Sequence, residues 1–197
     1  EVVRKAETVF LSVKPQFYPA VIEQIKGAVG ESQLIVTIAP GKTLDWLKGQ
    51  FGRELKIVRT MPNTPAMVGE GMTAACPNEN VTGEELSHVL DILNSFGKTE
   101  VVAEHLMDAV VSVSGSSPAY VFLMIEAMAD AAVAGGMPRA QAYTFAAQAV
   151  YGSAKMVLET GKHPGELKDM VCSPAGTTIE AVRVLEEKGF RSAMIEA

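Results

Sequence analysis

The sequence predicts an α/β fold in which a parallel sheet covered by helices is followed by an entirely helical part. In residues 1–103, short apolar runs alternate with segments that carry apolar residues at helical spacing. The runs show little polar–apolar alternation, which is typical of strands buried on both faces in parallel sheets. Strand patterns stop near residue 104, and helical patterns fill the rest of the chain. We therefore predict two domains, 1–103 and 104–197.

The first domain is predicted to hold five strands with helices between them. Pro and Gly residues end the early apolar runs, and Thr43 is a typical N-cap for the helix after the second run. The predicted strands cover residues 9–15, 34–41, 55–63, 71–77 and 98–103. The predicted helices cover residues 17–29, 43–51 and 82–96.

The second domain is predicted to associate with another copy of itself. The stretch SSPAYVFLMIEAMADAAVAGG (116–136) predicts a helix that begins with Ser116 as its cap and Pro118 in its first turn. Nearly all faces of this helix are apolar or small, so it must be buried on most sides. Because too little chain surrounds it to cover those faces, we predict a homodimer. Another long helix is predicted over 138–161.

Composition excludes several classes of protein. Of the 197 residues, 48% are hydrophobic and 20% are charged, which indicates a folded globular chain. A formal net charge of -6 and the absence of an Arg/Lys-rich stripe argue against a nucleic-acid partner. Polar residues interrupt the apolar stretches before they reach membrane-spanning length, so we expect no membrane partner. Cys76 and Cys172 form neither a disulfide framework nor a zinc pattern, which indicates the reducing cytoplasm, and the three isolated histidines predict no metal site.

A match to the dinucleotide-binding fingerprint G-x-G-x-x-A occurs at GEGMTA (69–74). That fingerprint works only between a strand and a helix N-terminus, where backbone amides face the pyrophosphate. Here a turn precedes the glycines and GMTAACP predicts a strand, so we interpret the match as coincidental. Either the chain binds no dinucleotide, or the first strand and its glycine loop lie upstream of Glu1.

Four segments in register carry a family resemblance: VKPQ (13–16), RTMPNTP (59–65), SGSSPAY (114–120) and HPGELKDMVCSPAGTTIEAVRVLEEKGFRSAMIEA (163–197). Together they resemble the pyrroline-5-carboxylate reductases over essentially the whole chain. The resemblance implies an incomplete Rossmann-type sheet for NADPH or NADH, followed by an all-helical dimerisation domain. It also implies reduction of 1-pyrroline-5-carboxylate to L-proline by hydride transfer, the last step of proline biosynthesis, in a homodimer that many members assemble further into rings.

The resemblance leaves two alternatives open and has local departures. We expect the family's opening glycine loop and its C-terminal end to lie outside this chain, so a catalytically impaired fragment that acts only as a helical dimer module is one alternative. The other is a related β-hydroxy acid dehydrogenase, although residues 116–136 lack the catalytic lysine of that class. Three positions depart from the family pattern: Ser117 and Ala175 replace glycines, and Pro40 replaces an alanine.

The stretch VCSPAGTTIE (171–180) is the predicted substrate site. The backbone amides of Gly176, Thr177 and Thr178 would open a helix, and such a helix end binds anions such as the substrate carboxylate. The resemblance implies that the Thr178 hydroxyl bonds the ring nitrogen, which makes it the candidate catalytic residue. The alternative is that the two threonines only cap the helix. Glu104 matches a family acid near the substrate and would favour the iminium form; alternatively it is a solvated carboxylate at a helix start.

The predicted cofactor site lies at the carboxyl ends of three consecutive strands. Doubly wound sheets bind their ligands at this edge. The residues that end the three strands are Ser12, Val13, Lys14 and Pro15, then Ala39 and Pro40, then Asn63. Lys14 would face phosphate, or else be an ordinary surface lysine. Asn63 would bond the nicotinamide side, or else cap a turn, and Ser114 and Ser116 would line the same crevice or cap a helix.

Overall fold

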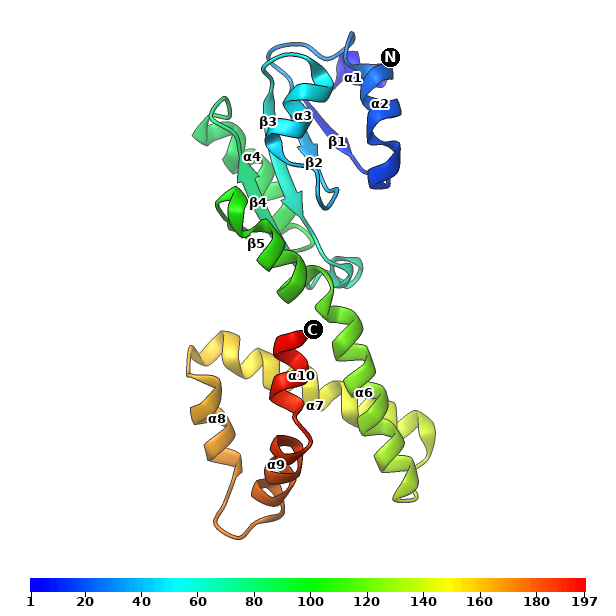
Figure 1. Cartoon of the computed structure of the whole chain (residues 1–197), viewed down its shortest axis with the longest axis vertical. Helices are drawn as coiled ribbons and strands as arrows, with labels where there is room; N and C mark the ends of the chain where they lie inside the picture. The colour runs from blue at the N-terminus through cyan, green and yellow to red at the C-terminus, as the bar shows by residue number, and fades with distance from the viewer. The chain divides into compact units, whose positions relative to one another are not determined.

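The computed structural model describes residues 1–197, which divide into two compact units, Glu1–Ala119 and Tyr120–Ala197 (Figure 1). The strands are β1 (Thr8–Leu11), β2 (Leu34–Thr37), β3 (Lys56–Met61), β4 (Gly71–Pro77) and β5 (Gly97–Val101). The helices up to β5 are α1 (Val2–Lys5), η1 (Pro15–Phe17), α2 (Tyr18–Ile25), α3 (Leu44–Phe51), η2 (Thr64–Val68) and α4 (Gly83–Asn94). The later helices are η3 (Glu104–Leu106), α5 (Met107–Val110), the π-helical turn η4 (Val111–Gly115), α6 (Ser117–Ala134), α7 (Arg139–Thr160), α8 (Pro164–Val171), α9 (Thr177–Glu187) and α10 (Phe190–Glu196).

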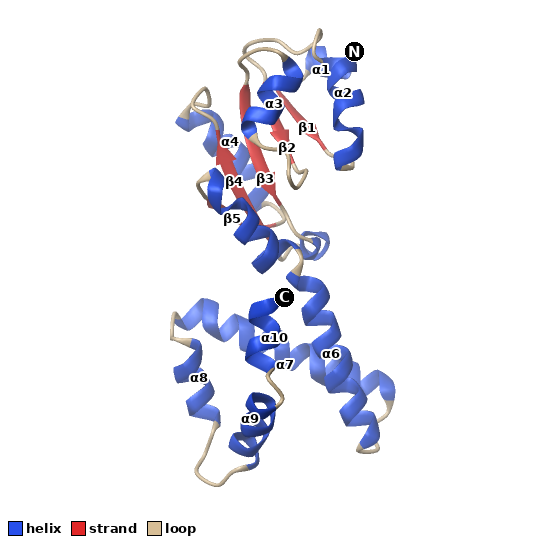
Figure 2. Cartoon of the chain, in the orientation of Figure 1, coloured by secondary structure: helices blue, strands red, loops and turns tan.

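The predicted fold class is confirmed: a Rossmann-like sheet is followed by helices alone (Figure 2). All five predicted strands form, and Thr43 caps α3 by accepting a hydrogen bond from the Trp46 amide at 3.1 Å. The strands β1 and β2 end earlier than the apolar runs that predicted them. The compact first unit extends to Ala119, past the predicted domain boundary at residue 103, because the first turns of the helical run pack on the sheet.

The sheet is mixed rather than wholly parallel. Its strands follow the order β1-β2-β3-β4-β5, with β1, β2 and β3 parallel, β4 antiparallel to β3, and β5 parallel to β4. The prediction of a parallel sheet was therefore wrong at β4. Only η2 connects β3 to β4, and a parallel return would need a crossover of a dozen or more residues.

Side chains alternate between two apolar layers, one on each face of the sheet. Ile35 and Ile57 pack into a cluster with residues of α2 and α3. Their neighbours Val36 and Val58 pack into a second cluster with residues of α4. Both faces are thus covered, as the weak polar–apolar alternation of the runs predicted.

Tyr18, in α2, is a fully buried side chain that ends in a polar group. Its hydroxyl donates a hydrogen bond to the Leu11 carbonyl at 2.6 Å and accepts one from the Ile38 amide at 3.2 Å. Burial raises the pKa of Tyr18, although the amides of Ile38 and Ala39 act in the opposite direction. The hydroxyl therefore keeps its proton at neutral pH and remains a donor.

The predicted helix start is confirmed, since α6 begins at Ser117 and has Pro118 in its first turn. Ser116 lies between η4 and α6 with helical backbone angles (φ -93°, ψ -29°), so it joins two helical turns rather than lying at the free end of a helix. The Ser116 amide donates to the Val111 carbonyl, five residues earlier, at 2.8 Å. This π-turn precedes Pro118, which has no amide to donate and would strain a regular helix. The wider turn accommodates the proline inside the run.

By length and composition alone, the run Glu104–Ala134 is apolar enough to cross a membrane, since an 18-residue window within it has a mean hydropathy of 1.3. Glu126 and Asp130 interrupt its apolar sequence, as predicted. Within the second unit, the fully buried residues between α6 and α7 are alanines, namely Ala129, Ala142 and Ala146, with Ile125, Val133 and Met137 only partly buried against them. Large apolar side chains remain exposed on the same helices, among them Phe122, Leu123, Phe145 and Leu158.

Thr37 and Thr60 form a matched pair for testing buried hydroxyls. Thr60 Oγ1 donates to the Thr37 carbonyl at 2.9 Å, whereas the buried Thr37 hydroxyl has no partner. We expect Thr37→Val to raise the free energy of unfolding by about 1 kcal/mol, because an unpaired polar atom leaves the core. Thr60→Val should lower it by a similar amount. Urea unfolding followed by Trp46 fluorescence measures both, and equal effects of the two variants would contradict this account.

Candidate active site

Three parallel strands end together at one edge of the sheet. The register pairs Leu11 with Thr37, and Thr37 with Arg59, so the loops after β1, β2 and β3 leave the sheet side by side. The structure thereby brings every predicted cofactor residue to this one edge. A doubly wound sheet offers its ligand site at the same place.

The residues at this edge differ in what they can present to a ligand. Ser12 and Lys14 are exposed, so a hydroxyl and an ammonium group are available there. Val13 packs against the core, Pro15 opens η1, and Ala39 is buried. Those three positions can offer only backbone groups or apolar contact. Pro40 is exposed and carries no amide hydrogen.

The Asn63 side chain hydrogen-bonds the backbone of two elements, β4 and η4. Its Oδ1 accepts a hydrogen bond from the Met72 amide at 2.8 Å, and its Nδ2 donates to the Ser114 carbonyl at 3.2 Å. The Ser114 carbonyl lies four residues before Pro118, which has no amide to satisfy it, and the Asn63 amide takes that place. The alternative that the Asn63 side chain caps a turn is wrong, since it makes no capping bond to η2.

Glu104 is part of an ion pair rather than a solvated carboxylate. Its Oε1 accepts from Arg59 Nη1 at 2.9 Å and from the Leu44 amide, at the start of α3, at 2.7 Å. The Arg59 side chain is only 6% exposed, and a buried guanidinium requires such a partner. Burial raises the pKa of the neighbouring Cys76 thiol, and the Glu104 charge raises it further, so Cys76 remains an unreactive thiol.

Arg59 is the residue that our sequence analysis did not assign. It appears in the sequence as the only charge in the run IVRTMP (57–62), and this is the signal that could have found it. A charge in a strand buried on both faces must be paired, and acidic residues after the last strand are the natural candidates.

The start of α9 holds the predicted substrate residues. Gly176 is the N-cap residue, and neither Thr177 nor Thr178 makes a capping bond, so the capping interpretation is wrong. The Gly176 amide is not available as predicted, because it donates to the Ser173 carbonyl at 3.0 Å. The amides of Thr177 and Thr178, in the first turn of an 11-residue helix, have no acceptor within the helix.

The loop before α9 has an unusual backbone at Ala175. Its φ of 58° lies in the left-handed region, and it is the only residue other than glycine with a positive φ. At the next position, a Cβ on Gly176 would meet Ser173 Oγ, which can rotate away, and would lie 3.1 Å from the Ser173 carbonyl oxygen, which is a tight contact. Glycine is therefore favoured at 176, and the alanine at 175 is strained.

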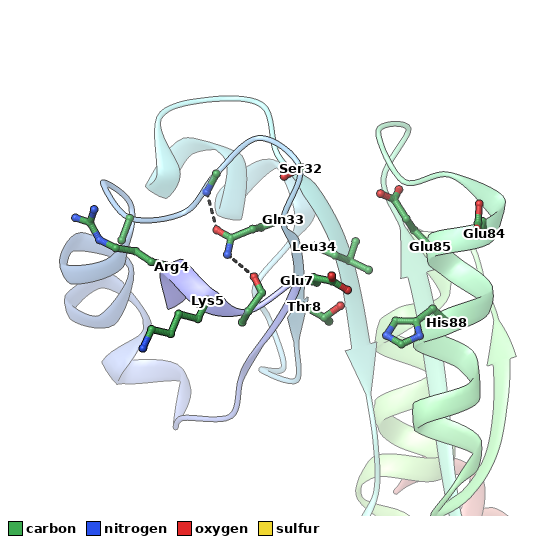
Figure 3. A pocket seen from close by; sticks show the side chains of 13 residues that line it. Arg4, Lys5, Glu7, Thr8, Ser32, Gln33, Leu34, Glu84, Glu85 and His88 are labelled. Carbon is green, nitrogen blue, oxygen red and sulfur yellow. Dashed lines mark hydrogen bonds between the residues drawn. The ribbon is translucent and has the colours of Figure 1, made fainter. Parts of the chain in front are cut away.

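A hollow lies at another place on the sheet. It measures about 870 Å³ and borders Thr8 and Leu34, the first residues of β1 and β2, at the opposite edge of the sheet (Figure 3). Gln33 crosses beside it and donates to the carbonyls of Val3 and Ala6, both at 2.5 Å. The charged side chains around it are Arg4 and Lys5 from α1, Glu7 from just before β1, and Glu84 and Glu85 from α4, which also places His88 there. None of the predicted site residues lines this hollow.

The glycines of GEGMTA do not form a pyrophosphate loop. Gly69 ends η2 in a left-handed conformation, and Gly71 begins β4. A strand follows where the fingerprint needs a helix, so the interpretation of this match as coincidental is confirmed.

Comparison with known proteins decides the family. A family model described as pyrroline-5-carboxylate reductase dimerisation matches residues 104–197. A pyrroline-5-carboxylate reductase of Escherichia coli K12 is 62% identical over 197 residues, which are 100% of this chain and 73% of that relative. The chain belongs to the pyrroline-5-carboxylate reductase family.

More distant members of the family share the fold. A pyrroline-5-carboxylate reductase of Arabidopsis thaliana is 42% identical over all of this chain and 71% of its own length. The crystal structure of Plasmodium falciparum pyrroline carboxylate reductase with NADP bound matches at 35% identity and a TM-score of 0.91, over 98% of this chain and 74% of that one. The predicted resemblance is confirmed, and the alternative of a β-hydroxy acid dehydrogenase is set aside.

Ala175 and Gly176 provide opposite tests of the loop geometry. We expect Ala175→Gly to raise the free energy of unfolding by about 1 kcal/mol, since glycine adopts a positive φ without steric cost. Gly176→Ala should destabilise the protein, because its Cβ would make a tight contact with the Ser173 carbonyl oxygen. Thermal unfolding followed by circular dichroism measures both. A loss of stability in Ala175→Gly would show that the left-handed conformation is not strained.

Glu104→Ala tests the ion pair. We expect it to lower the free energy of unfolding by roughly 2–3 kcal/mol, because it leaves the Arg59 guanidinium buried without a carboxylate. Glu100→Ala, which removes an exposed carboxylate from β5, is the matched control and should change stability by less than about 0.5 kcal/mol. Equal effects in urea unfolding would mean that Arg59 finds another partner.

Proposed function

We propose that this chain reduces 1-pyrroline-5-carboxylate to L-proline with a hydride from NADPH or NADH, as the last step of proline biosynthesis. The observation that carries the proposal is the 62% identity to the Escherichia coli reductase over the whole chain. The fold adds a site of the right kind, since three strand ends meet at one edge of the sheet.

The residues at that edge suit part of a dinucleotide. An exposed ammonium at Lys14 and a hydroxyl at Ser12 match phosphate and ribose. We propose that the same cofactor-binding surface also includes Val13, Pro15, Ala39 and Pro40. Asn63 would contact the nicotinamide side of the cofactor. When bound, the reduced nicotinamide supplies the hydride.

For the substrate, we propose that the amides of Thr177 and Thr178 hold the carboxylate and that the Thr178 hydroxyl bonds the ring nitrogen. A protonated C=N bond accepts hydride at its carbon and keeps the proton on nitrogen as the amine forms, so positioning supplies most of the rate gain. The role proposed for Gly176 in the substrate site is to leave space, because it has no side chain. Glu104 remains a proposed substrate-binding residue, although the Arg59 guanidinium offsets the charge with which it would favour the iminium.

The family model supports a homo-oligomer, and we propose a homodimer that assembles further into rings. Exposed apolar side chains on α6 and α7, such as Phe122 and Phe145, supply the surface that a second copy would cover. We place the enzyme in the cytoplasm and expect no nucleic-acid partner, given the net charge of -6.

The direct test is oxidation of NADPH, followed by its absorbance, with and without 1-pyrroline-5-carboxylate. Oxidation that depends on the substrate, with formation of proline, is the expected result. A folded oligomer that oxidises no NADPH and no NADH would favour the alternative of a helical dimer module.

Thr178→Ala tests the proposed substrate contact. We expect a higher KM for 1-pyrroline-5-carboxylate and a lower kcat, with a combined loss in kcat/KM of about 1–3 kcal/mol, because a hydrogen bond to a charged group is removed. Thr160→Ala, which truncates an exposed threonine at the end of α7, is the matched control. Unchanged kinetics in Thr178→Ala would remove this residue from the site.

A further inference from the structure

Tyr18 continues the pairing of β1 and β2 beyond the point where the two strands separate. The last backbone pair between them is Leu11 with Thr37. Just past this pair, the Tyr18 hydroxyl accepts from the Ile38 amide at 3.2 Å and donates to the Leu11 carbonyl at 2.6 Å. One side chain thus connects the ends of two neighbouring strands beyond their last backbone pair.

The loops after these two strands are the ones assigned to the cofactor, so the inference rests on the proposed function. Ser12 follows directly on Leu11, and Ala39 follows directly on Ile38. A shift in either strand end would move the atoms that the loop presents to a dinucleotide. The Tyr18 ring itself is fully buried and cannot touch a ligand.

The second loop is held at its other end as well. The Leu44 amide, where α3 begins, donates to Glu104 at 2.7 Å. Between these ends, Lys42 Nζ lies 4.2 Å from the centre of the Trp46 ring, and the Trp46 ring centre lies 6.5 Å from that of Tyr18. Tyr18 and Glu104 therefore fix the start and the end of the segment that contains Ala39 and Pro40.

We propose that Tyr18 is a positioning residue for the cofactor: its hydroxyl holds the carboxyl ends of β1 and β2 in the arrangement that binds NADPH or NADH. Packing alone would be supplied equally well by phenylalanine. What phenylalanine lacks is the oxygen, and without it the Ile38 amide and the Leu11 carbonyl lose their partner in a buried place.

The test is the variant Tyr18→Phe in the full-length enzyme. The Kd for NADPH is measured by quenching of Trp46, the single tryptophan of this chain, or by tritiated NADPH if the complete protein contains another. The KM values for NADPH and for 1-pyrroline-5-carboxylate are measured alongside. We expect the Kd and KM for NADPH to rise about fivefold, with the KM for the substrate within about twofold of the parent value.

Ile22→Val is the matched control, because Ile22 lies on the same helix and in the same cluster but makes no polar contact. It should cost comparable stability and leave the Kd for NADPH unchanged. An unchanged Kd in Tyr18→Phe, or an equal rise in Ile22→Val, would overturn the inference. These outcomes differ from failure of the proposed function, in which the parent enzyme itself would not bind or oxidise NADPH.

Hydrogen exchange in the parent protein provides a second measurement should Tyr18→Phe fail to fold. We expect NADP to slow exchange of the Ile38 amide, since the ligand would hold the strand ends closed. Exchange at Ile38 that is indifferent to NADP would overturn the inference without any variant.

Discussion

The ion pair between Arg59 and Glu104 is the interaction on which much of the first unit depends. A guanidinium on a strand covered on both faces cannot remain unpaired, so the chain must bring a carboxylate to it. Glu104 does so from the start of the helical run, and the same oxygen accepts the Leu44 amide. One carboxylate thereby joins β3, the N-terminus of α3 and the beginning of the helices.

Asn63 makes a comparable connection a few residues further along the chain. It satisfies the Ser114 carbonyl that Pro118 leaves without a helical donor, and it accepts the Met72 amide at the start of β4. The π-turn, the proline and the asparagine therefore belong to one arrangement, in which a helix carrying a proline is anchored to the sheet. The polar side chains at this edge hydrogen-bond the backbone around the site, so the surface is already ordered before a ligand binds.

The two units place different demands on the chain. The sheet buries its residues within one copy, because helices cover both faces. The second unit buries mainly alanines between α6 and α7 and leaves large apolar side chains exposed. This pattern agrees with the family model, which describes residues 104–197 as a dimerisation region. The catalytic proposals divide in the same way, with the cofactor residues in the first unit and Gly176, Thr177 and Thr178 in the second.

The sequence by itself determined the five strands, the helices between them and the family, because apolar spacing and the segments from VKPQ to SPAGTT are local signals. It predicted the strand ends that lie at one edge, but not the antiparallel β4 or the π-helical turn that leads into α6. Only the tertiary structure decided that Glu104 pairs with Arg59, that Tyr18 bridges two strand ends, and that the Gly176 amide is already occupied. These hydrogen bonds and ion pairs join residues that are far apart in the sequence or lie in a turn. Hydrophobic periodicity does not indicate which buried polar groups will pair, so the sequence could not predict them.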